Sequence, residues 1–144
     1  MGTGTTPDQA FPAVLVRLWG DAGVECDLRN PAVNGFRTDD LVRDELPLLR
    51  SFRPTLVTLL IGANDIVAAL RATGVDDAAL GRYRAQLRAI HERITADAPD
   101  ARRFALPQPD WSVTPAGASF GDPGAVARAI ERYNEIARAE CVRT

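Results

Sequence analysis

Four stretches of the chain carry apolar residues at every third or fourth position, the spacing of one helical face. They predict helices over about residues 6–20, 38–52, 76–98 and 125–141. Proline interrupts two of them, so we expect the first helix to kink or to begin near Pro12, and the second to kink or divide at Pro47. Thr38 is expected as the N-cap of the second helix. A loop or short helix should occupy residues 66–74.

Three shorter stretches predict strands. Residues 24–29 alternate apolar and polar side chains, as in an edge strand with one face in water. Residues 55–61 read TLVTLLI, a nearly unbroken apolar run that is typical of a central parallel strand covered on both faces. Residues 104–106 form the third strand. The strict alternation of helix and strand predicts a single α/β domain over residues 1–144, a three-layer α/β/α sandwich with a parallel sheet, as in flavodoxin-like folds.

The predicted sheet is incomplete. Three strands are few for such a fold, and the chain enters through a loop and ends on a helix, so we expect segments to be missing at both ends. If a missing strand belongs between residues 24–29 and 55–61, those two cannot pair across the gap, because paired strands lie about 4.8 Å apart. We therefore expect a gapped sheet with exposed apolar surface.

Composition narrows the classes of partner. The chain is 46% hydrophobic and 25% charged, as in one ordinary globular domain. Its net charge of −2 gives no reason to expect nucleic acid or an anionic membrane as a partner. No stretch approaches the roughly 18 apolar residues of a membrane span. The N-terminus lacks a basic region followed by an apolar core, so a cytoplasmic location is expected unless the coding sequence continues upstream of Met1.

Residue types exclude several chemistries. All 17 basic residues are arginine, so a Schiff-base lysine, a Walker-type P-loop and a Ser-Lys dyad are excluded. Cys26 and Cys141 are far apart, and with one histidine in the chain they support neither a zinc site nor a disulfide framework. We expect no metal and no cofactor. The single histidine, His91, has Arg88 three positions before it and is expected to be a solvated surface residue.

Gly62-Ala63-Asn64-Asp65 ends the apolar run of the central strand. The carboxyl ends of parallel strands are where open α/β sheets bind their ligands, so an amide and a carboxylate at this place are candidate functional groups. Glycine and asparagine are also preferred turn residues. These four residues alone leave a functional site and an ordinary turn equally open.

A second segment supports the functional interpretation. Asn30 to Gly35 (NPAVNG), followed by FRTDDL, and the GAND segment resemble the second and third conserved blocks of the SGNH, or GDSL, hydrolase family. In that family a glycine backbone N–H and an asparagine amide form the oxyanion hole with the N–H of the nucleophilic serine. The resemblance implies these roles for Gly35 and Asn64. It also implies hydrolysis of a small-molecule ester by a Ser-His-Asp mechanism.

The chain departs from the family pattern at both catalytic motifs. Gly-Asp-Ser and Asp-x-x-His are absent from the printed sequence. Residues 1–7 are similar to the segment after Gly-Asp-Ser in the family, so we expect the nucleophile just upstream of Met1 and the histidine beyond the last helix. Ser51, Ser112 and Ser119 lie in no strand-to-helix elbow. The chain is therefore expected to be a fragment that is inactive alone.

The resemblance makes a geometric prediction. The Gly35 N–H and the Asn64 side-chain amide should converge on one pocket near residues 1–5, with their nitrogens within about 6 Å, so that one oxygen reaches both. Asp110 and Trp111, which follow the third strand, would lie at the same sheet edge and line the substrate pocket, or else form a turn with a packing aromatic residue.

Two functions of other classes remain as alternatives. A non-catalytic binding module or pseudoenzyme would keep the same cleft without turnover. A flavodoxin-like or receiver-type switch domain fits the alternation of helices and strands, but a receiver needs a lysine and a flavin site needs a phosphate-binding turn after the first strand. Both features are missing from this sequence.

Overall fold

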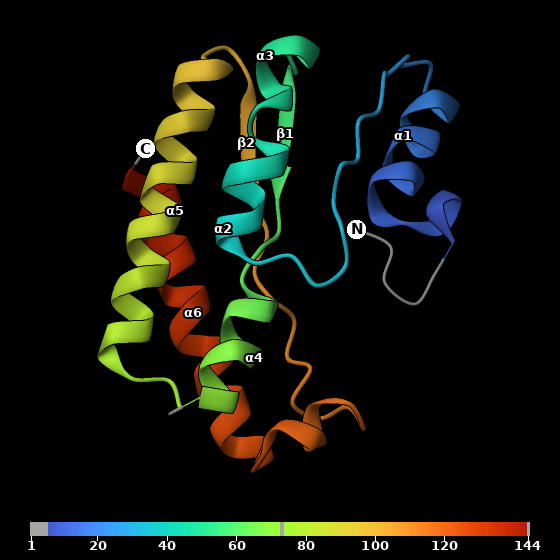
Figure 1. Cartoon of the computed structure of the whole chain (residues 1–144). Helices are drawn as coiled ribbons and strands as arrows, with labels where there is room; N and C mark the ends of the chain where they lie inside the picture. The colour runs from blue at the N-terminus through green and yellow to red at the C-terminus, as the bar shows by residue number, and fades with distance from the viewer. Residues whose placement is uncertain (1–5, 73, 144) are drawn as a thin grey trace. The chain divides into compact units, whose positions relative to one another are not determined.

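The computed structural model describes residues 6–72 and 74–143, and the chain divides into two compact units, residues 1–36 and 37–144 (Figure 1). The first unit contains a 3-10 turn (Pro7–Gln9) and helix α1 (Phe11–Asp21). The sequence allowed either a kink at Pro12 or a helix that begins near it. Helix α1 begins next to Pro12, so the second arrangement is the one observed. None of its residues is fully buried.

The predicted edge strand over residues 24–29 is wrong. This segment has no regular secondary structure and forms no ladder with any described residue. Its side chains Val24 and Leu28 are 51% and 44% exposed. A period-two pattern produces a strand only where a neighbouring strand supplies the ladder partners, and no described segment supplies them here.

The second unit contains the sheet and the remaining helices. In chain order its elements are α2 (Thr38–Asp40), a π-helical turn (Leu41–Glu45), α3 (Leu48–Phe52), β1 (Leu56–Leu59), α4 (Ala63–Ala72), α5 (Asp77–Asp97), β2 (Arg102–Ala105), a 3-10 turn (Gly117–Phe120) and α6 (Pro123–Arg143).

Capping residues and prolines in the sequence predicted most of these helix boundaries. Pro47 is the N-cap of α3 and divides the second predicted helix, as expected. The Asp76 carboxylate caps α5 by accepting the Ala79 N–H at 2.7 Å. The expectation that Thr38 is an N-cap is wrong, because Thr38 is the first helical residue of α2 and Arg37 holds the cap position. Its hydroxyl bonds instead to side chains distant in the sequence.

The sheet of the described residues is a parallel pair, β1 and β2, with Thr58 opposite Phe104. Both strands were predicted, although β2 begins at Arg102 and not at residue 104. The expectation that β1 is central and covered on both faces is wrong for the described residues, where β1 pairs along one edge only. Phe104 is 55% exposed and Thr58 is exposed, so this face of the pair is uncovered.

The core lies on the other face of the strand pair. Helices α5 and α6 pack side by side there (Figure 1), and Val57 and Leu59 of β1 pack against the same cluster. The buried residues of the cluster are Leu41, Leu46, Ile66, Tyr83, Leu87, Ile90, Ile94, Val126, Ala129, Ile130, Tyr133 and Ile136. All of them belong to the second unit.

His91 is buried, so its expected position on the surface is wrong. It is 3% exposed and follows Leu87 by four residues, on the helical face that meets the core. Its surroundings are largely apolar, with the residues Leu59, Ile61, Tyr83, Leu87, Ala105, Leu106 and Ala137. Burial lowers the pKa of His91, and the cations Arg103 and Arg143 lower it further, against the opposing effect of Glu140.

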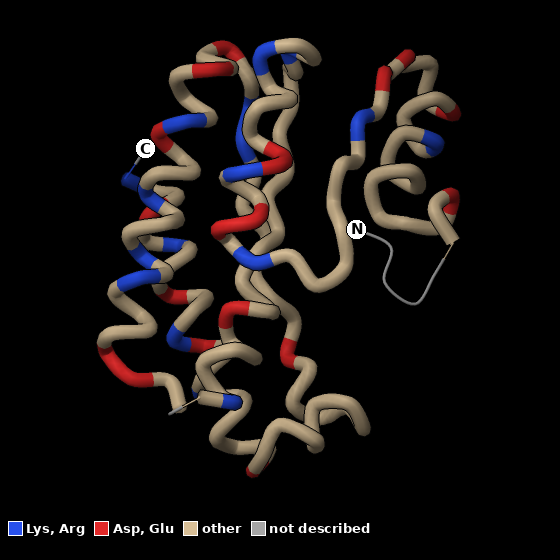
Figure 2. Tube along the Cα trace, in the orientation of Figure 1, with Lys and Arg blue, Asp and Glu red and all other residues tan. Residues whose placement is uncertain are grey.

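Charged residues of both signs are interspersed along the helices of the second unit (Figure 2). The side chain of Asp97 is 2% exposed and pairs with Arg50 at 2.7 Å and also with Arg93. The side chain of Glu140 is 5% exposed and pairs with Arg88 and Arg143. These cations lower the pKa of both carboxyl groups.

The remaining sequence features concern the cysteines and membrane spans. Cys26 and Cys141 are free thiols. Over the described part of the chain, every helix is too short or too polar to cross a membrane.

We predict that acid weakens the fold through His91. A histidine whose folded-state pKa is lowered gives stability that is complete above its unfolded pKa of about 6.5 and is lost as the pH falls below that value. The urea midpoint of the chain should therefore be lower at pH 5.5 than at pH 7.5, and His91→Leu should remove most of this difference.

The chain has one histidine, so its ring protons can be followed alone by NMR. We expect a midpoint below 6.5 in the folded protein. A midpoint at or above 6.5, or an unchanged pH dependence in His91→Leu, would contradict the assignment.

Candidate functional site

Gly62 follows the end of β1 by three residues and has a conformation that favours glycine. Its φ is +123°, and a Cβ at this position would lie 2.6 Å from the Tyr83 hydroxyl oxygen. That hydroxyl donates to the Ile61 carbonyl at 3.1 Å. The absence of a side chain at Gly62 therefore lets Tyr83 of α5 reach the Ile61 carbonyl, in the segment between β1 and α4.

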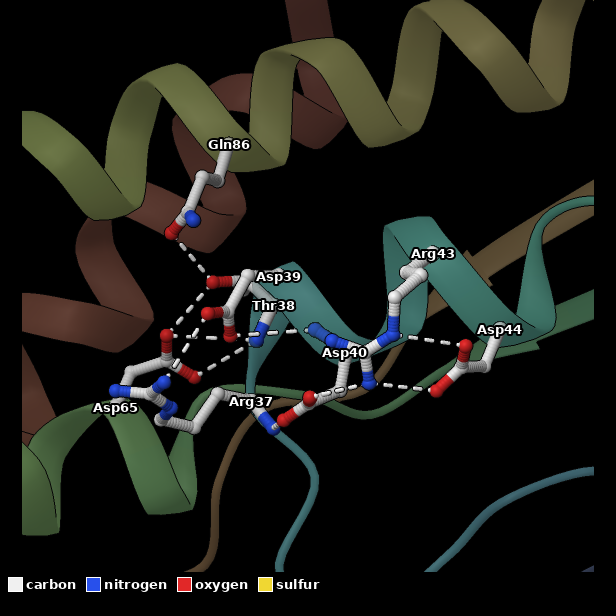
Figure 3. A network of polar contacts seen from close by, with 8 residues as sticks. All are labelled: Arg37, Thr38, Asp39, Asp40, Arg43, Asp44, Asp65 and Gln86. Carbon is white, nitrogen blue, oxygen red and sulfur yellow. Dashed lines mark hydrogen bonds and ion pairs between the residues drawn. The ribbon is translucent and has the colours of Figure 1, made fainter.

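Asn64 and Asp65 lie in the first helical turn of α4. The change of chain direction after β1 is therefore made at Gly62, and the two polar residues begin the helix. Both are half-buried. The Asp65 carboxylate accepts the Thr38 N–H at 3.2 Å and the Thr38 hydroxyl at 2.6 Å. Figure 3 shows this carboxylate directed at the start of α2. Thr38 is fully buried, so these bonds satisfy polar groups that water does not reach.

The Thr38 hydroxyl also contacts the Gln86 amide of α5 at 2.5 Å (Figure 3). A hydroxyl has one hydrogen, so it can donate to only one of its two oxygen neighbours. The Gln86 atom that faces the hydroxyl is the side-chain oxygen, so the hydroxyl donates either to Gln86 or to Asp65 and not to both at once. Three elements, α2, α4 and α5, are thus joined at one hydroxyl.

Asp65 lies where burial opposes its charge. Burial raises the pKa of its carboxyl group, and the hydrogen bonds from Thr38 reduce that rise. Burial, with a contribution from the charge of Asp65, also raises the pKa of Tyr133 to about 12. Nearby, Arg37 pairs with Asp39 at 3.1 Å at the exposed side of the network.

A cavity of about 300 Å³ opens beside Asp65, within the second unit. Its walls come from α2, α4, α5 and α6, and its lining residues are Arg37, Asp39, Asp65, Ala68, Ala69, Ala72, Gly74, Ala79, Arg82, Tyr83, Gln86 and Tyr133. The sequence does not predict this cavity. The helical period places Tyr83 and Tyr133 on the apolar stripes of α5 and α6, but it does not show where their hydroxyl groups point.

Gly35 lies in the first unit, in a turn that the Phe36 N–H closes by donating to the Val33 carbonyl at 3.3 Å. Its φ is +95°, which favours glycine. Asn64 belongs to the second unit, so the convergence of the two nitrogens stays a prediction. The predicted approach of residues 1–5 to this pocket lies outside the described residues.

Asp110 and Trp111 have the contacts of a local turn. The Asp110 carboxylate accepts the Ser112 N–H at 3.0 Å and its hydroxyl at 2.5 Å, an Asx-type arrangement. Trp111 packs edge-on against Phe120 with 5.8 Å between ring centroids. The Trp111 indole nitrogen is buried and has no hydrogen-bond partner among the described residues. A role of either residue in substrate binding stays a prediction.

The serines have local partners within the described chain. Ser51 donates to the Leu48 carbonyl at 3.1 Å and Ser119 to the Ala116 carbonyl at 2.6 Å, while Ser112 donates to Asp110. His91 contacts none of them through a hydrogen bond and lies among apolar side chains. The described residues therefore hold no serine–histidine pair.

The comparisons with known proteins agree with the predicted fold. The chain matches the family model of the GDSL-like lipase/acylhydrolases over residues 1–144. It is similar in structure to an extracellular lipase from Streptomyces rimosus, with a TM-score of 0.66 and 22% sequence identity, over 94% of this chain and 64% of that one. The chain thus spans less than two thirds of that lipase. No curated protein matches the chain. The structural similarity confirms an incomplete α/β/α sandwich.

We predict opposite effects for alanine at two glycines. Gly62→Ala should lower the free energy of unfolding by about 2 kcal/mol, because it strains the backbone and displaces Tyr83. Gly81, in α5, has no atom within 4 Å of a built Cβ, so Gly81→Ala should raise stability by up to about 1 kcal/mol. Urea titration followed by tryptophan fluorescence measures both. A Gly62→Ala variant as stable as the parent would contradict the contact with Tyr83.

Proposed function

The chain belongs to the GDSL-like lipase/acylhydrolase family, and on that basis we propose that it is a single domain, the central part of a serine ester hydrolase, which contributes two oxyanion donors, Gly35 and Asn64. The proposed substrate is a small-molecule ester. The observation that carries the proposal is the family match over the whole chain, together with an asparagine in the first turn of the helix that follows β1.

The proposed donors fit the chemistry of ester hydrolysis. Attack by a serine on an ester carbonyl places a negative charge on the carbonyl oxygen, and a donor fixed at that oxygen stabilises the transition state by about 3 kcal/mol. A glycine N–H lets the substrate approach without a side chain in the way. An asparagine amide donates without adding a charge. The half-buried position of Asn64 in a helix limits the conformations its amide can take.

Chain connectivity supports the convergence of the two donors. Gly35 is three residues before Thr38, and three residues span at most about 11 Å. Thr38 is hydrogen-bonded to Asp65, the neighbour of Asn64. The linking segment is therefore short enough to allow Gly35 to reach the helical turn that carries Asn64, as the proposal requires. We propose that the Asp65–Thr38 bonds position this turn for catalysis.

We further propose that the chain does not hydrolyse esters alone. Each serine donates to its own neighbourhood, and the only histidine is buried in the core. In the working enzyme, a serine and a histidine from segments that flank this sequence would supply the nucleophile and the base. Asp110 and Trp111, in the segment after β2, are proposed to line the substrate pocket.

A non-catalytic binding module is the alternative function. The lack of the Gly-Asp-Ser and Asp-x-x-His motifs in the printed sequence favours it. The coding DNA on both sides distinguishes the two functions. In-frame Gly-Asp-Ser upstream and Asp-x-x-His downstream support the hydrolase, and stop codons at both ends support the module.

We predict that the 144-residue chain neither hydrolyses p-nitrophenyl butyrate above the rate in buffer nor reacts with a fluorophosphonate probe. Without a base to take its proton, a serine is a weak nucleophile. Mass spectrometry of the probe-treated chain checks each serine. Specific labelling of Ser51, Ser112 or Ser119 would show that the nucleophile is assigned to the wrong segment.

In the longer polypeptide encoded with its flanking segments, we predict that Asn64→Ala lowers kcat by about 100-fold with little change in KM, as expected for a donor that acts in the transition state. Asn64→Asp should lower kcat further, because it places a negative charge beside the oxyanion. Urea midpoints of both variants test folding. Equal kcat values for Asn64→Ala and the parent would exclude Asn64 as an oxyanion donor.

A further inference from the structure

We propose that Asn134 of α6 is a positioning residue for the proposed substrate pocket. Its side-chain amide pairs twice with the backbone of Gln108, 26 positions earlier in the chain. The Asn134 Oδ1 atom accepts the Gln108 N–H at 2.8 Å, and the Asn134 Nδ2 atom donates to the Gln108 carbonyl at 2.9 Å. The inference rests on the proposed function, in which Trp111 lines the pocket.

Gln108 lies in a conformationally restricted arm, residues 106–110 (LPQPD). The prolines on both sides of it have a fixed φ and no N–H, and each disfavours a helical conformation in the residue before it. The Leu106 N–H donates to the Leu59 carbonyl at 2.8 Å, so the arm starts at the end of the strand pair. The next backbone N–H of the arm is that of Gln108, which Asn134 accepts. The strand pair and α6 therefore both hold the arm.

The segment after the arm is folded largely on itself. The Trp111 carbonyl accepts the Thr114 hydroxyl at 2.7 Å, and the Thr114 hydroxyl oxygen accepts the Gly117 N–H at 3.0 Å. These bonds shape the segment but do not attach it to a helix. Gln108 Nε2 and Trp111 Nε1 are buried donors without a partner among the described residues, and such donors oppose burial. The paired bonds from Asn134 act against this cost.

Trp111 is connected both to the arm and to helix α4. It follows Gln108 by three residues, so at most about 11 Å of chain separates them. Its ring packs edge-on against Phe120, and the Arg71 guanidinium lies 5.2 Å from the centroid of the Phe120 ring. Arg71 belongs to α4, the helix whose first turn carries Asn64. A shift of the arm would therefore move Trp111 relative to the proposed oxyanion donor.

The contacts of Asn134 predict an effect on substrate binding and not on the chemical step. Asn134 bonds to the backbone of the arm, and Trp111 offers the ester an apolar surface away from the reacting carbonyl. Such a surface binds the substrate and the transition state equally, so its displacement raises KM and leaves kcat unchanged. The expected pattern is the opposite of that for Asn64→Ala, which lowers kcat.

Amide hydrogen exchange in the ¹⁵N-labelled 144-residue chain tests the hold on the arm without any enzymatic activity. Asn134→Leu should speed exchange of the Gln108 amide by about tenfold or more, because its hydrogen bond is lost, and should shift the Trp111 indole N–H signal. The chain has two tryptophans, so Trp19→Phe assigns the indole signals. Glu135→Leu, at the adjacent exposed position of α6, should change neither readout.

Further variants separate local loosening from unfolding. The amide of Ile90, buried in α5, shows whether each variant is folded, and Asn134→Ala replaces Asn134→Leu if that amide loses its protection. Asn134→Asp keeps the acceptor for the Gln108 N–H but loses the donor, so part of the Gln108 protection should remain. Unchanged Gln108 exchange together with an unchanged Trp111 indole signal in a folded variant would overturn the proposal.

Kinetics of the longer polypeptide, encoded with its flanking segments, test the effect on the pocket. Asn134→Leu should raise KM for p-nitrophenyl butyrate by about three- to tenfold, with kcat within about twofold of the parent value. Asn134→Asp should raise KM less. Trp111→Ala should raise KM by a similar factor, and the double variant should raise it no further, because Asn134 acts through Trp111.

The parent polypeptide distinguishes the two ways of failing. If it hydrolyses the ester, an unchanged KM in Asn134→Leu, or KM effects that multiply in the double variant, would overturn this proposal and leave the hydrolase function intact. If the parent polypeptide does not hydrolyse esters, the proposed function fails, and the role of Asn134 in the pocket fails with it.

Discussion

The hydrogen bonds between the Asp65 carboxylate and Thr38 determine the arrangement of the polar end of the second unit. A carboxylate that is partly removed from water is tolerated only where donors replace the lost hydration. Here the donors are the backbone N–H and the hydroxyl of one residue, 27 positions earlier in the chain. This link joins the first turns of α2 and α4 across the intervening strand.

Much of the candidate functional site depends on the hydrogen bonds between Asp65 and Thr38. It fixes the first turn of α4, which carries Asn64, and it places Asp65 in the wall of the cavity. The amide of Gln86 reaches the same threonine, so α5 is held in the network as well. Helix α4 therefore carries the Asn64 amide on one helical stripe and the Asp65 carboxylate on the adjacent stripe.

The features that sequence predicts well here depend on neighbours along the chain. Asp76 caps α5 through a residue three positions away, and Pro47 divides a helix by its own geometry. The predicted strand at residues 24–29 was wrong, because a strand also requires a partner from elsewhere. His91 was misassigned for a related reason. Its arginine and glutamate neighbours suggested a surface, whereas the packing of α6 and the strand pair on α5 decides its burial.

The residues of the candidate site also divide into those that a local sequence pattern predicts and those that depend on contacts with distant segments. Gly35 and Asn64 were predicted because their sequence context resembles known conserved blocks, and their roles stay predictions. Gly62 is required by a contact with Tyr83 that no local pattern contains. Thr38 was assigned to a helix cap, a role its residue type suggests, but its hydroxyl meets groups from two other helices. The cavity could not be predicted, because it is a property of four elements at once.

The ion pairs of Asp97 and Glu140 involve only arginine, and this restricts the conditions that can break them. A guanidinium keeps its proton above pH 12, whereas a lysine ammonium loses its proton near pH 10. The paired carboxyl groups have lowered pKa values, so they too remain ionised as the solution becomes more alkaline. These pairs are therefore neutralised from the acidic side alone. The helices that these ion pairs join therefore remain paired at alkaline pH. Ion pairs made with lysine in the same positions would lose their positive charge under those conditions.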